Sequence, residues 1–302
     1  MNDRTTYSSR ERVRRAIRHE TADRLPRGEL CINDSVILRQ LNCQRAGFDE
    51  KLSFVNQMGL DIYTLSPVRP DRQNKLPAPG ELLWPDIEKW TGQTPLFTFA
   101  LVDGAFELGM RFHDRLDFLT LYRRSPLSLA EFVSEVESLN IALYREAAEK
   151  GIDGIIIADD VAYGKGFLMN PQALREHFFP SLERQVKEIE RLGLPAFFHS
   201  DGYYREIIPD LIRMGFKGIQ CLERSCGMDL WELHGEFGRE LCLWGHIATE
   251  DTLKAHDPGL LGEMASALGR LSCREGVILG TDCGLFEGTD LSGLKRIYET
   301  AC

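Results

Sequence analysis

The sequence lacks several patterns that would place it quickly in a class. None of its eight cysteines forms a C-x-x-C pair, which excludes a zinc ribbon and a thioredoxin-like motif. No apolar run is long enough to span a bilayer, and the N-terminus lacks the apolar core of a signal peptide. We therefore expect a cytoplasmic protein with free thiols and no membrane contact.

Basic residues are also fewer than acidic residues. The chain has 36 basic and 46 acidic residues, for a net charge of −10. This balance argues against a nucleic-acid partner and against a polyanionic substrate. No G-x-G-x-x-G opens the first predicted strand–helix turn, so a dinucleotide-binding sheet is only weakly indicated.

The clearest pattern present is a strand–helix–strand unit in residues 194–223. Apolar residues 195–198 and 218–222 predict two buried strands, and the segment between them has helical periodicity up to Gly215. Both strands end on polar side chains. In a parallel α/β fold the carboxyl ends of the strands carry the chemistry.

Eight strand signals alternate with helices along the chain. They cover residues 30–32, 60–65, 95–102, 152–158, 195–198, 218–222, 241–244 and 277–279. The count predicts a single α/β domain over residues 1–302, a (β/α)₈ TIM barrel with an N-terminal helical extension at residues 9–19. Helices are expected at 36–41, 51–58, 106–121, 127–150 and 171–192, and loops at 67–80 and 161–171.

The predicted strand ends gather thiol, imidazole and carboxylate groups at one edge. These are the ligands of Zn²⁺, and three of them with an open fourth position make a catalytic zinc site. Such an ion lowers the pKa of a bound water or alters the reactivity of a substrate oxygen or sulfur. The residues concerned are Asp159, Asp160, His199, Asp201, Cys221, Glu223, His246 and Cys283.

Each of these residues also has an ordinary structural explanation. Cys221 and Cys242 lie within apolar strands, where packing is the favoured interpretation of both, and Cys283 could equally be a buried thiol. The carboxylates could cap a helix, form a turn before glycine or pair at the surface. The shared position of His199, Glu223 and Cys283 directly after strands shifts the balance towards a metal.

At these residues the sequence resembles a known family. The segments FHSDGYYREIIPDLIRMGFKGIQCLERSCG, GVILGTDCGLFEGTDLSGLK, RERVRRAIRHETADRLP and ADDVAYGKGFLMNPQALREHFFP are similar to the uroporphyrinogen decarboxylase superfamily. The resemblance implies one (β/α)₈ barrel. It also implies one of two activities, porphyrinogen decarboxylation or zinc-dependent methyl transfer with a methylcorrinoid.

The decarboxylase pattern fails at three places. Its substrate-gripping arginines correspond to the stretch RGELCINDSV, which has Glu29 and Asp34 instead. Its pyrrole-steering aspartate falls near Leu65, Ser66 and Pro67, where no carboxylate is present. Its C-terminal histidine corresponds to Cys283.

The methyltransferase branch fits better. Its coenzyme M members bind zinc with H-x-C and a distant cysteine, which correspond to His199, Asp201 and Cys283 here. Asp201 replaces the middle cysteine, so Glu223 is expected to complete the ligand set, with Asp201 as competitor or as partner of the histidine. One thiolate instead of two makes zinc harder and suits an oxygen substrate, as in the methyltransferases of corrinoid O-demethylases.

The resemblance therefore implies zinc held by His199, Glu223 and Cys283 at the ether oxygen of a methoxylated, aromatic substrate. A Co(I) corrinoid (cobalamin) on a separate partner protein would take the methyl group. Asp160 and Tyr163 are predicted to be catalytic, and Glu29, Phe167 and His246 to contact the substrate, with Tyr163, Phe167 and the 84–90 loop forming an aromatic pocket. The alternatives are methyl transfer involving a thiol, methylamine or methanol, uroporphyrinogen decarboxylation, and a non-catalytic metal-binding barrel.

Overall fold

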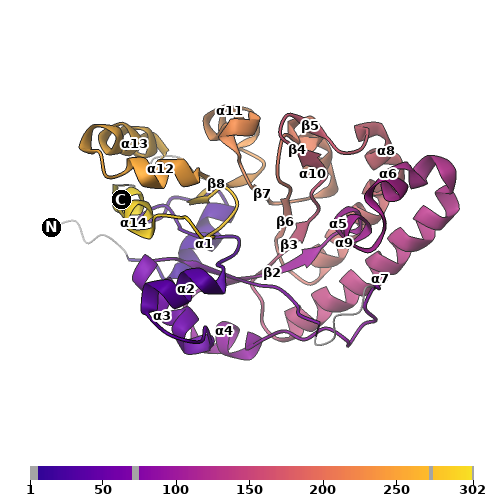
Figure 1. The fold of residues 1–302 in the computed structure, drawn as a ribbon, viewed down its shortest axis with the longest axis horizontal. Coiled ribbons are helices and arrows are strands. Elements are labelled where there is room, and N and C mark those ends of the chain that lie inside the picture. Colours follow the sequence, from indigo (N-terminus) through magenta and orange to yellow (C-terminus); the bar gives the residue numbers. More distant parts are fainter. Residues whose placement is uncertain (1–5, 70–74, 272–274, 301–302) are drawn as a thin grey trace.

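A curled sheet of seven parallel strands forms the centre of the protein (Figure 1). The computed structural model describes residues 6–69, 75–271 and 275–300. In sheet order the strands are β1 (Ile62–Leu65), β2 (Phe97–Asp103), β3 (Gly154–Ala158), β6 (Ala196–His199), β7 (Gly218–Gln220), β8 (Cys242–Ile247) and β9 (Val277–Thr281). Each coincides with a predicted strand signal, which confirms seven of the eight.

The helices alternate with the strands as expected, but two of the predicted helices are each divided into two. The predicted helix 106–121 is two helices, because Asp114 accepts from the backbone N–H groups of Leu116 and Asp117 and starts a new one. The predicted helix 171–192 divides at Phe178, where Pro180 has no N–H to continue the first. The helices before β3 are α1 (Ser9–Ile17), α2 (Asp34–Leu41), α3 (Phe48–Met58), α4 (Ile87–Gln93), α5 (Ala105–Phe112), α6 (Arg115–Arg124) and α7 (Pro126–Glu149).

The second half of the chain carries the remaining helices. They are α8 (Pro171–His177), α9 (Phe179–Arg191), α10 (Ile208–Met214), α11 (Leu230–Phe237), α12 (Thr249–Lys254), α13 (Pro258–Leu271) and α14 (Leu291–Thr300). Two 3₁₀ turns, η1 (Arg205–Ile207) and η2 (Arg224–Cys226), follow β6 and β7. In the part of the chain that the structure describes, no helix is both long and apolar enough to cross a bilayer.

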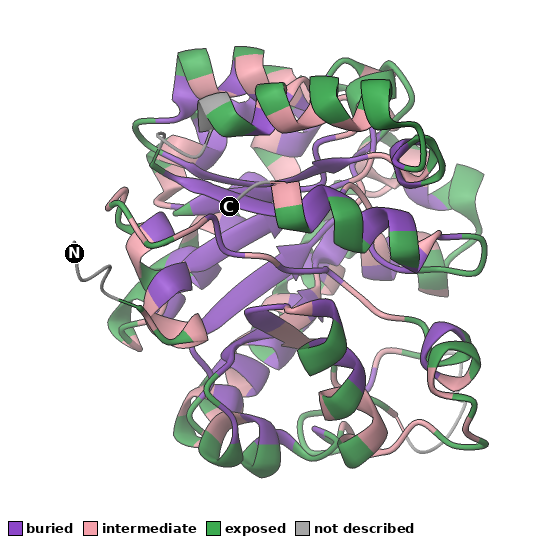
Figure 2. Cartoon of the chain, turned by 90° about the vertical axis from the view of Figure 1, so that its left-hand side faces the viewer, coloured by how far each residue is buried: buried purple, intermediate pink, exposed green. Residues whose placement is uncertain are grey.

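Alternation along the strands builds two apolar cores, one on each side of the sheet. We call the smaller cluster, on the concave side of the sheet, the inner cluster, and the larger one, between sheet and helices, the outer cluster. In β6, Phe197 belongs to the inner cluster and Phe198 to the outer cluster, as the two-residue period of a strand requires. The strands are accordingly buried on both faces, as the purple sheet in Figure 2 shows. The inner cluster consists of Val13, Ala16, Leu30, Ile62, Phe97, Phe99, Ile156, Phe197, Cys242, Trp244 and Ile278.

Helix α1 contributes to this inner core. Val13 and Ala16 lie among the inward residues of the strands, and Arg12 of the same helix donates to Asp61, just before β1, at 2.6 Å. The predicted N-terminal extension therefore packs against the amino-terminal side of the sheet. This leaves the carboxyl ends of the strands for the functional groups.

The predicted eighth strand at residues 30–32 is wrong. Only isolated bridges form nearby, from Arg27 to Leu279 and from Ile32 to Leu285. Residues 26–28 nevertheless bond to both sheet edges: the Gly28 N–H donates to the Leu279 carbonyl at 2.9 Å, and the Asp61 N–H to the Arg27 carbonyl at 2.7 Å. The contact is too close for a side chain, because a Cβ on Gly280 would lie 2.0 Å from the Gly28 carbonyl oxygen.

Candidate functional site

His199 ends β6 and is 7% exposed. Its Nδ1 lies 2.5 Å from Oε1 of Gln220 on β7. The Gln220 amide is oriented by its own Nε2, which donates to the Asp282 carbonyl at 3.0 Å. Oε1 must then accept from an Nδ1–H, so the Nε2 lone pair of His199 is left for another partner.

Two carboxylates face that Nε2 atom. Oδ1 of Asp160 lies 3.5 Å from it and Oδ1 of Asp201 lies 3.9 Å from it. Burial raises the pKa of Asp160, although His199 and the Asp201 N–H, which donates to Oδ1 at 2.9 Å, oppose the shift. An imidazole nitrogen and two carboxylate oxygens thus converge on one point.

A second group shares Asp201. The Cys221 Sγ lies 3.1 Å from Asp201 Oδ1, and Glu223 brings a carboxylate oxygen to the same place. In each group, Asp160–His199–Asp201 and Asp201–Cys221–Glu223, the ligand atoms all lie within 4.8 Å of one another. We refer to these five residues as the strand-end cluster.

The hairpin formed by β4 (Ala162–Tyr163) and β5 (Gly166–Phe167) packs against this cluster, where a loop was predicted. Gly202 has φ +78°, and a Cβ there would lie 2.6 Å from the Tyr163 Cα, so only glycine fits beneath the hairpin. The Tyr163 side chain is 60% exposed, and Phe167 is half-buried. Asp201 therefore has the hairpin backbone next to it.

Asp159 and Asp160 are neighbours with different surroundings. The Asp159 carboxylate accepts from the Glu107 N–H at 2.8 Å, at the start of α5, and Gly104 leaves room for it. Asp159 therefore caps the start of an earlier helix, and not the segment that follows it, which is where the sequence suggested a cap. Burial raises the pKa of Asp159 to about 8. Asp160 alone of the pair faces His199.

Glu29 lies at the other side of the sheet edge, next to β9. It is 2% exposed and accepts from the Thr281 N–H, the Thr281 hydroxyl and the Tyr298 hydroxyl. Burial raises its pKa to about 7, against these hydrogen bonds. Cys283 points to Asp282, with Sγ 3.3 Å from Oδ1, and belongs to neither described group within 4.8 Å.

His246 of β8 is 7% exposed and has φ +96°. Its ring makes an edge contact with Trp231, and Nδ1 has no hydrogen-bond partner among the described residues. Burial, and then the charge of Arg224, lower the pKa of His246 to about 4. The ring is therefore neutral at physiological pH.

The tryptophans expected in the aromatic pocket lie in the core. The 84–90 segment is mostly helix α4, and Trp84 and Trp90 are buried, with Trp90 stacked on Tyr63 at 3.5 Å between ring centroids. The prediction that these indoles line a substrate pocket is wrong, because they pack against other core residues; Pro85 between them lines a cavity that also includes Glu29.

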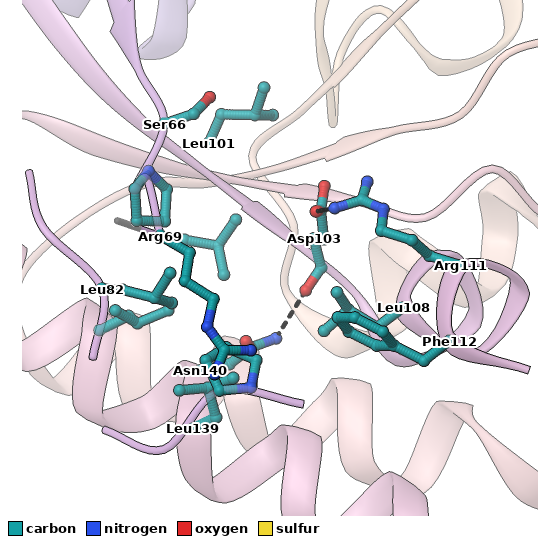
Figure 3. Close-up of a pocket in the computed structure, with 14 residues that line it drawn as sticks. Ser66, Arg69, Leu82, Leu101, Asp103, Leu108, Arg111, Phe112, Leu139 and Asn140 are labelled. Carbon is teal, nitrogen blue, oxygen red and sulfur yellow. Dashed lines mark hydrogen bonds and ion pairs between the residues drawn. The ribbon is translucent and has the colours of Figure 1, made fainter. Parts of the chain in front are cut away.

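A cavity of about 190 Å³ lies beside the ends of β1 and β2 instead (Figure 3). Apolar residues of α5 and α7 line it together with the ion pair of Asp103 and Arg111, 2.6 Å long. None of the strand-end cluster lines this cavity. Arg111 also bonds Glu107, whose pKa is raised by burial and by Asp160.

The donor types of the strand-end cluster fit a transition metal such as zinc. One imidazole, one thiol and three carboxylates supply nitrogen, sulfur and oxygen. Cys221 is the member that the sequence interpretation assigned to packing. Its position at a strand end, two residues before Glu223, was the available signal.

Comparison with known proteins agrees with this architecture. A model described as uroporphyrinogen decarboxylase (URO-D) matches residues 62–301. The chain belongs to the URO-D family. No curated protein matches the sequence.

Solved structures resemble this URO-D chain in fold. A methyltransferase from Methanosarcina mazei has a TM-score of 0.75 at 16% identity, over 98% of each chain. A broad-specificity endoglucanase from an uncultured bacterium has a TM-score of 0.51 at 10% identity, over 99% of this chain and 97% of the other. Identities this low show the fold alone.

Proposed function

We propose that this URO-D family member is a zinc-dependent methyltransferase that moves a methyl group from a methyl ether to a Co(I) corrinoid carried by a partner protein. The observation that carries the proposal is the strand-end cluster, in which the His199 Nε2 lone pair and the Asp201 carboxylate converge. The similar Methanosarcina mazei structure is a methyltransferase, which supports the same choice.

The neighbouring residues argue against decarboxylation of a polycarboxylate. Glu29 and Asp34 stand where the sequence comparison expected arginines, and Glu29 is buried among hydroxyl donors. Asp34 pairs at the surface with Lys51 at 3.0 Å. An acidic mouth would repel a substrate with many carboxylates.

His199 and Asp201 would hold the metal, with Glu223 from the second group that shares Asp201. A zinc ion there would act as a Lewis acid and make an aryl oxygen a better leaving group. Gln220 holds the His199 ring so that Nε2, and not Nδ1, faces the site. Asp160, which lies 3.5 Å from the His199 Nε2, would pass a proton to the departing oxygen.

The reaction balances without an external oxidant. The O–CH₃ bond breaks, the Co(I) corrinoid supplies the electron pair of the new Co–CH₃ bond, and the aryl oxygen takes a proton. The corrinoid is a second substrate that arrives on its own protein. Tyr163 is exposed on the β4–β5 hairpin, and its backbone approaches Gly202, next to Asp201, so we place the methoxyarene beside this residue.

The test is a methyl-transfer assay with purified protein holding about one zinc per chain. The assay supplies a Co(I) corrinoid protein and a methoxyarene such as guaiacol. We expect the corrinoid to be converted from Co(I) to methyl-Co(III), and its visible absorbance measures this conversion. Activity only with methanol, methylamines or a thiol would exclude the ether but retain the methyltransferase. Release of CO₂ from uroporphyrinogen would overturn both assignments.

A further inference from the structure

We propose that Cys221 supplies the thiolate ligand of the metal site. This inference rests on the metal of the proposed function and not on its substrate. The Cys221 side chain is fully buried, and its Sγ lies 3.1 Å from the Asp201 carboxylate. Cys283, the cysteine favoured from the sequence, directs its Sγ to Asp282.

The backbone turns Cys221 towards the cluster. Adjacent side chains on a strand point to opposite faces, so Gln220 and Cys221 should not both reach one site. They do, because Cys221 has φ +74°, in the left-handed region that residues other than glycine rarely adopt. The Tyr204 hydroxyl lies 3.1 Å from the Gln220 carbonyl oxygen and 3.0 Å from that of Cys221, which holds this turn in place.

Cys242 is a matched comparison within the same molecule. Both thiols are 0% exposed, and the sequence assigned both to packing. Cys242 belongs to the inner apolar cluster with Phe197 and Trp244, whereas Cys221 belongs to neither apolar cluster. Cys242 therefore behaves as a small apolar residue, and Cys221 is placed among ligand groups.

The spacing around Asp201 brings the thiol within reach of one ion. Ligand atoms around a tetrahedral zinc lie about 3.3–3.8 Å apart, given bonds of about 2.0–2.3 Å. Asp201 Oδ1 lies 3.1 Å from the Cys221 Sγ, and the ligand atoms of Asp201, Cys221 and Glu223 all lie within 4.8 Å of one another. An ion bound by Asp201 could therefore take the thiolate and Glu223 as ligands, while His199 belongs to the neighbouring group that shares Asp201.

The charges around this thiol favour a cation. Cys221 lies beside the carboxylates of Asp201 and Glu223, and a divalent cation stabilises a thiolate ligand and neutralises such carboxylates together. A thiolate ligand also selects zinc or cobalt over magnesium and calcium.

The test counts sulfur ligands and does not depend on methyl transfer. Metal-free protein is titrated with Co²⁺ while the near-ultraviolet sulfur-to-cobalt charge-transfer band is recorded. The zinc form is measured by X-ray absorption, where a Zn–S shell lies at about 2.3 Å. We expect the wild type to show both signals.

The variants are Cys221→Ser, which preserves size, and Cys221→Gly, whose backbone tolerates φ +74°. Each should lose the band and the Zn–S shell, with zinc affinity at least about tenfold lower. Cys242→Ser and Cys283→Ser should keep both signals. Circular dichroism establishes that each variant is folded.

The outcomes separate this inference from the proposed function. If both Cys221 variants keep the band, or the wild type shows none, Cys221 is not a ligand, whatever the methyl-transfer assay gives. If the band is lost in the Cys221 variants, but the wild type transfers a methyl group from none of the donors in the methyl-transfer assay, the ligand assignment stands and the proposed function fails.

Discussion

Two carboxylate sites lie along the same edge of the sheet and differ in what surrounds them. Glu29, beside β9, accepts from a backbone N–H and two hydroxyl groups. Asp201, between β6 and β7, has the Cys221 thiol and the Nε2 lone pair of His199 as neighbours. The first is rich in hydrogen-bond donors and the second is rich in metal ligands.

The difference shows how a carboxylate can be assigned a role. Glu29, which is 2% exposed, accepts several hydrogen bonds and is satisfied by the protein itself. The Asp201 side chain is 49% exposed and lies beside other carboxylates, a thiol and a lone pair, which are the groups that a cation gathers. The two acids therefore differ both in exposure and in the chemistry of their neighbours.

The largest expected effect follows from removing the ligand charge at Asp201. Asp201 belongs to both ligand groups, so Asp201→Asn should lower zinc affinity more than about 100-fold, and more than Glu223→Gln does. The matched variant Glu29→Gln should leave zinc affinity unchanged. Competition with a chromogenic chelator measures all three, and a greater loss in Glu223→Gln would make Glu223 the principal ligand.

The next effect is on the orientation of His199. Gln220→Leu removes the acceptor of the Nδ1–H and should lower zinc affinity about 10- to 100-fold, because the ring loses its fixed tautomer. Gln220→Glu retains an acceptor and should preserve more of the affinity. Equal losses in the two variants would show that Gln220 does not act through this hydrogen bond.

At the donor-rich site the expected effect is on stability. The pKa of Glu29 is raised from 4.5 to about 7, so between these pH values the folded state holds a proton that the unfolded state has lost. Stability should therefore fall as pH rises through this window, and Glu29→Gln should remove that part of the dependence. Urea unfolding from pH 4 to 8 measures it, and an unchanged profile in the variant would assign the dependence elsewhere.

The same site offers a test at fixed pH. Tyr298→Phe removes one hydroxyl donor from the buried carboxylate and should destabilise the fold by about 1–3 kcal/mol. Zinc content should not change. Loss of zinc in this variant would contradict the separation of the two sites.

The smallest expected effect is at Tyr163. Its side chain is 60% exposed, so Tyr163→Phe should change stability by less than about 0.5 kcal/mol and leave zinc affinity intact. We expect kcat for methyl transfer to fall, because the residue is predicted to be catalytic. An unchanged kcat would remove Tyr163 from the mechanism.

Much of the scaffold follows from local patterns in the sequence. Short apolar segments between helical periods located β1, β2, β3, β6, β7, β8 and β9, because strands buried on both faces must be apolar throughout. The polar residues at the ends of β3, β6 and β7 could also be recognised, because each interrupts an apolar strand segment. Their position after a strand predicted the shared edge on which Asp160, His199 and Glu223 now lie.

Only the tertiary structure decided which of these groups meet. Residues 30–32 read as a strand but make isolated bridges, because residues 26–28 take the backbone partners on both edges. Cys221 and Cys242 are indistinguishable as thiols in apolar strands. A single backbone angle of +74°, held by a tyrosine from another element, turns the first towards Asp201, and no local pattern encodes a contact of that kind.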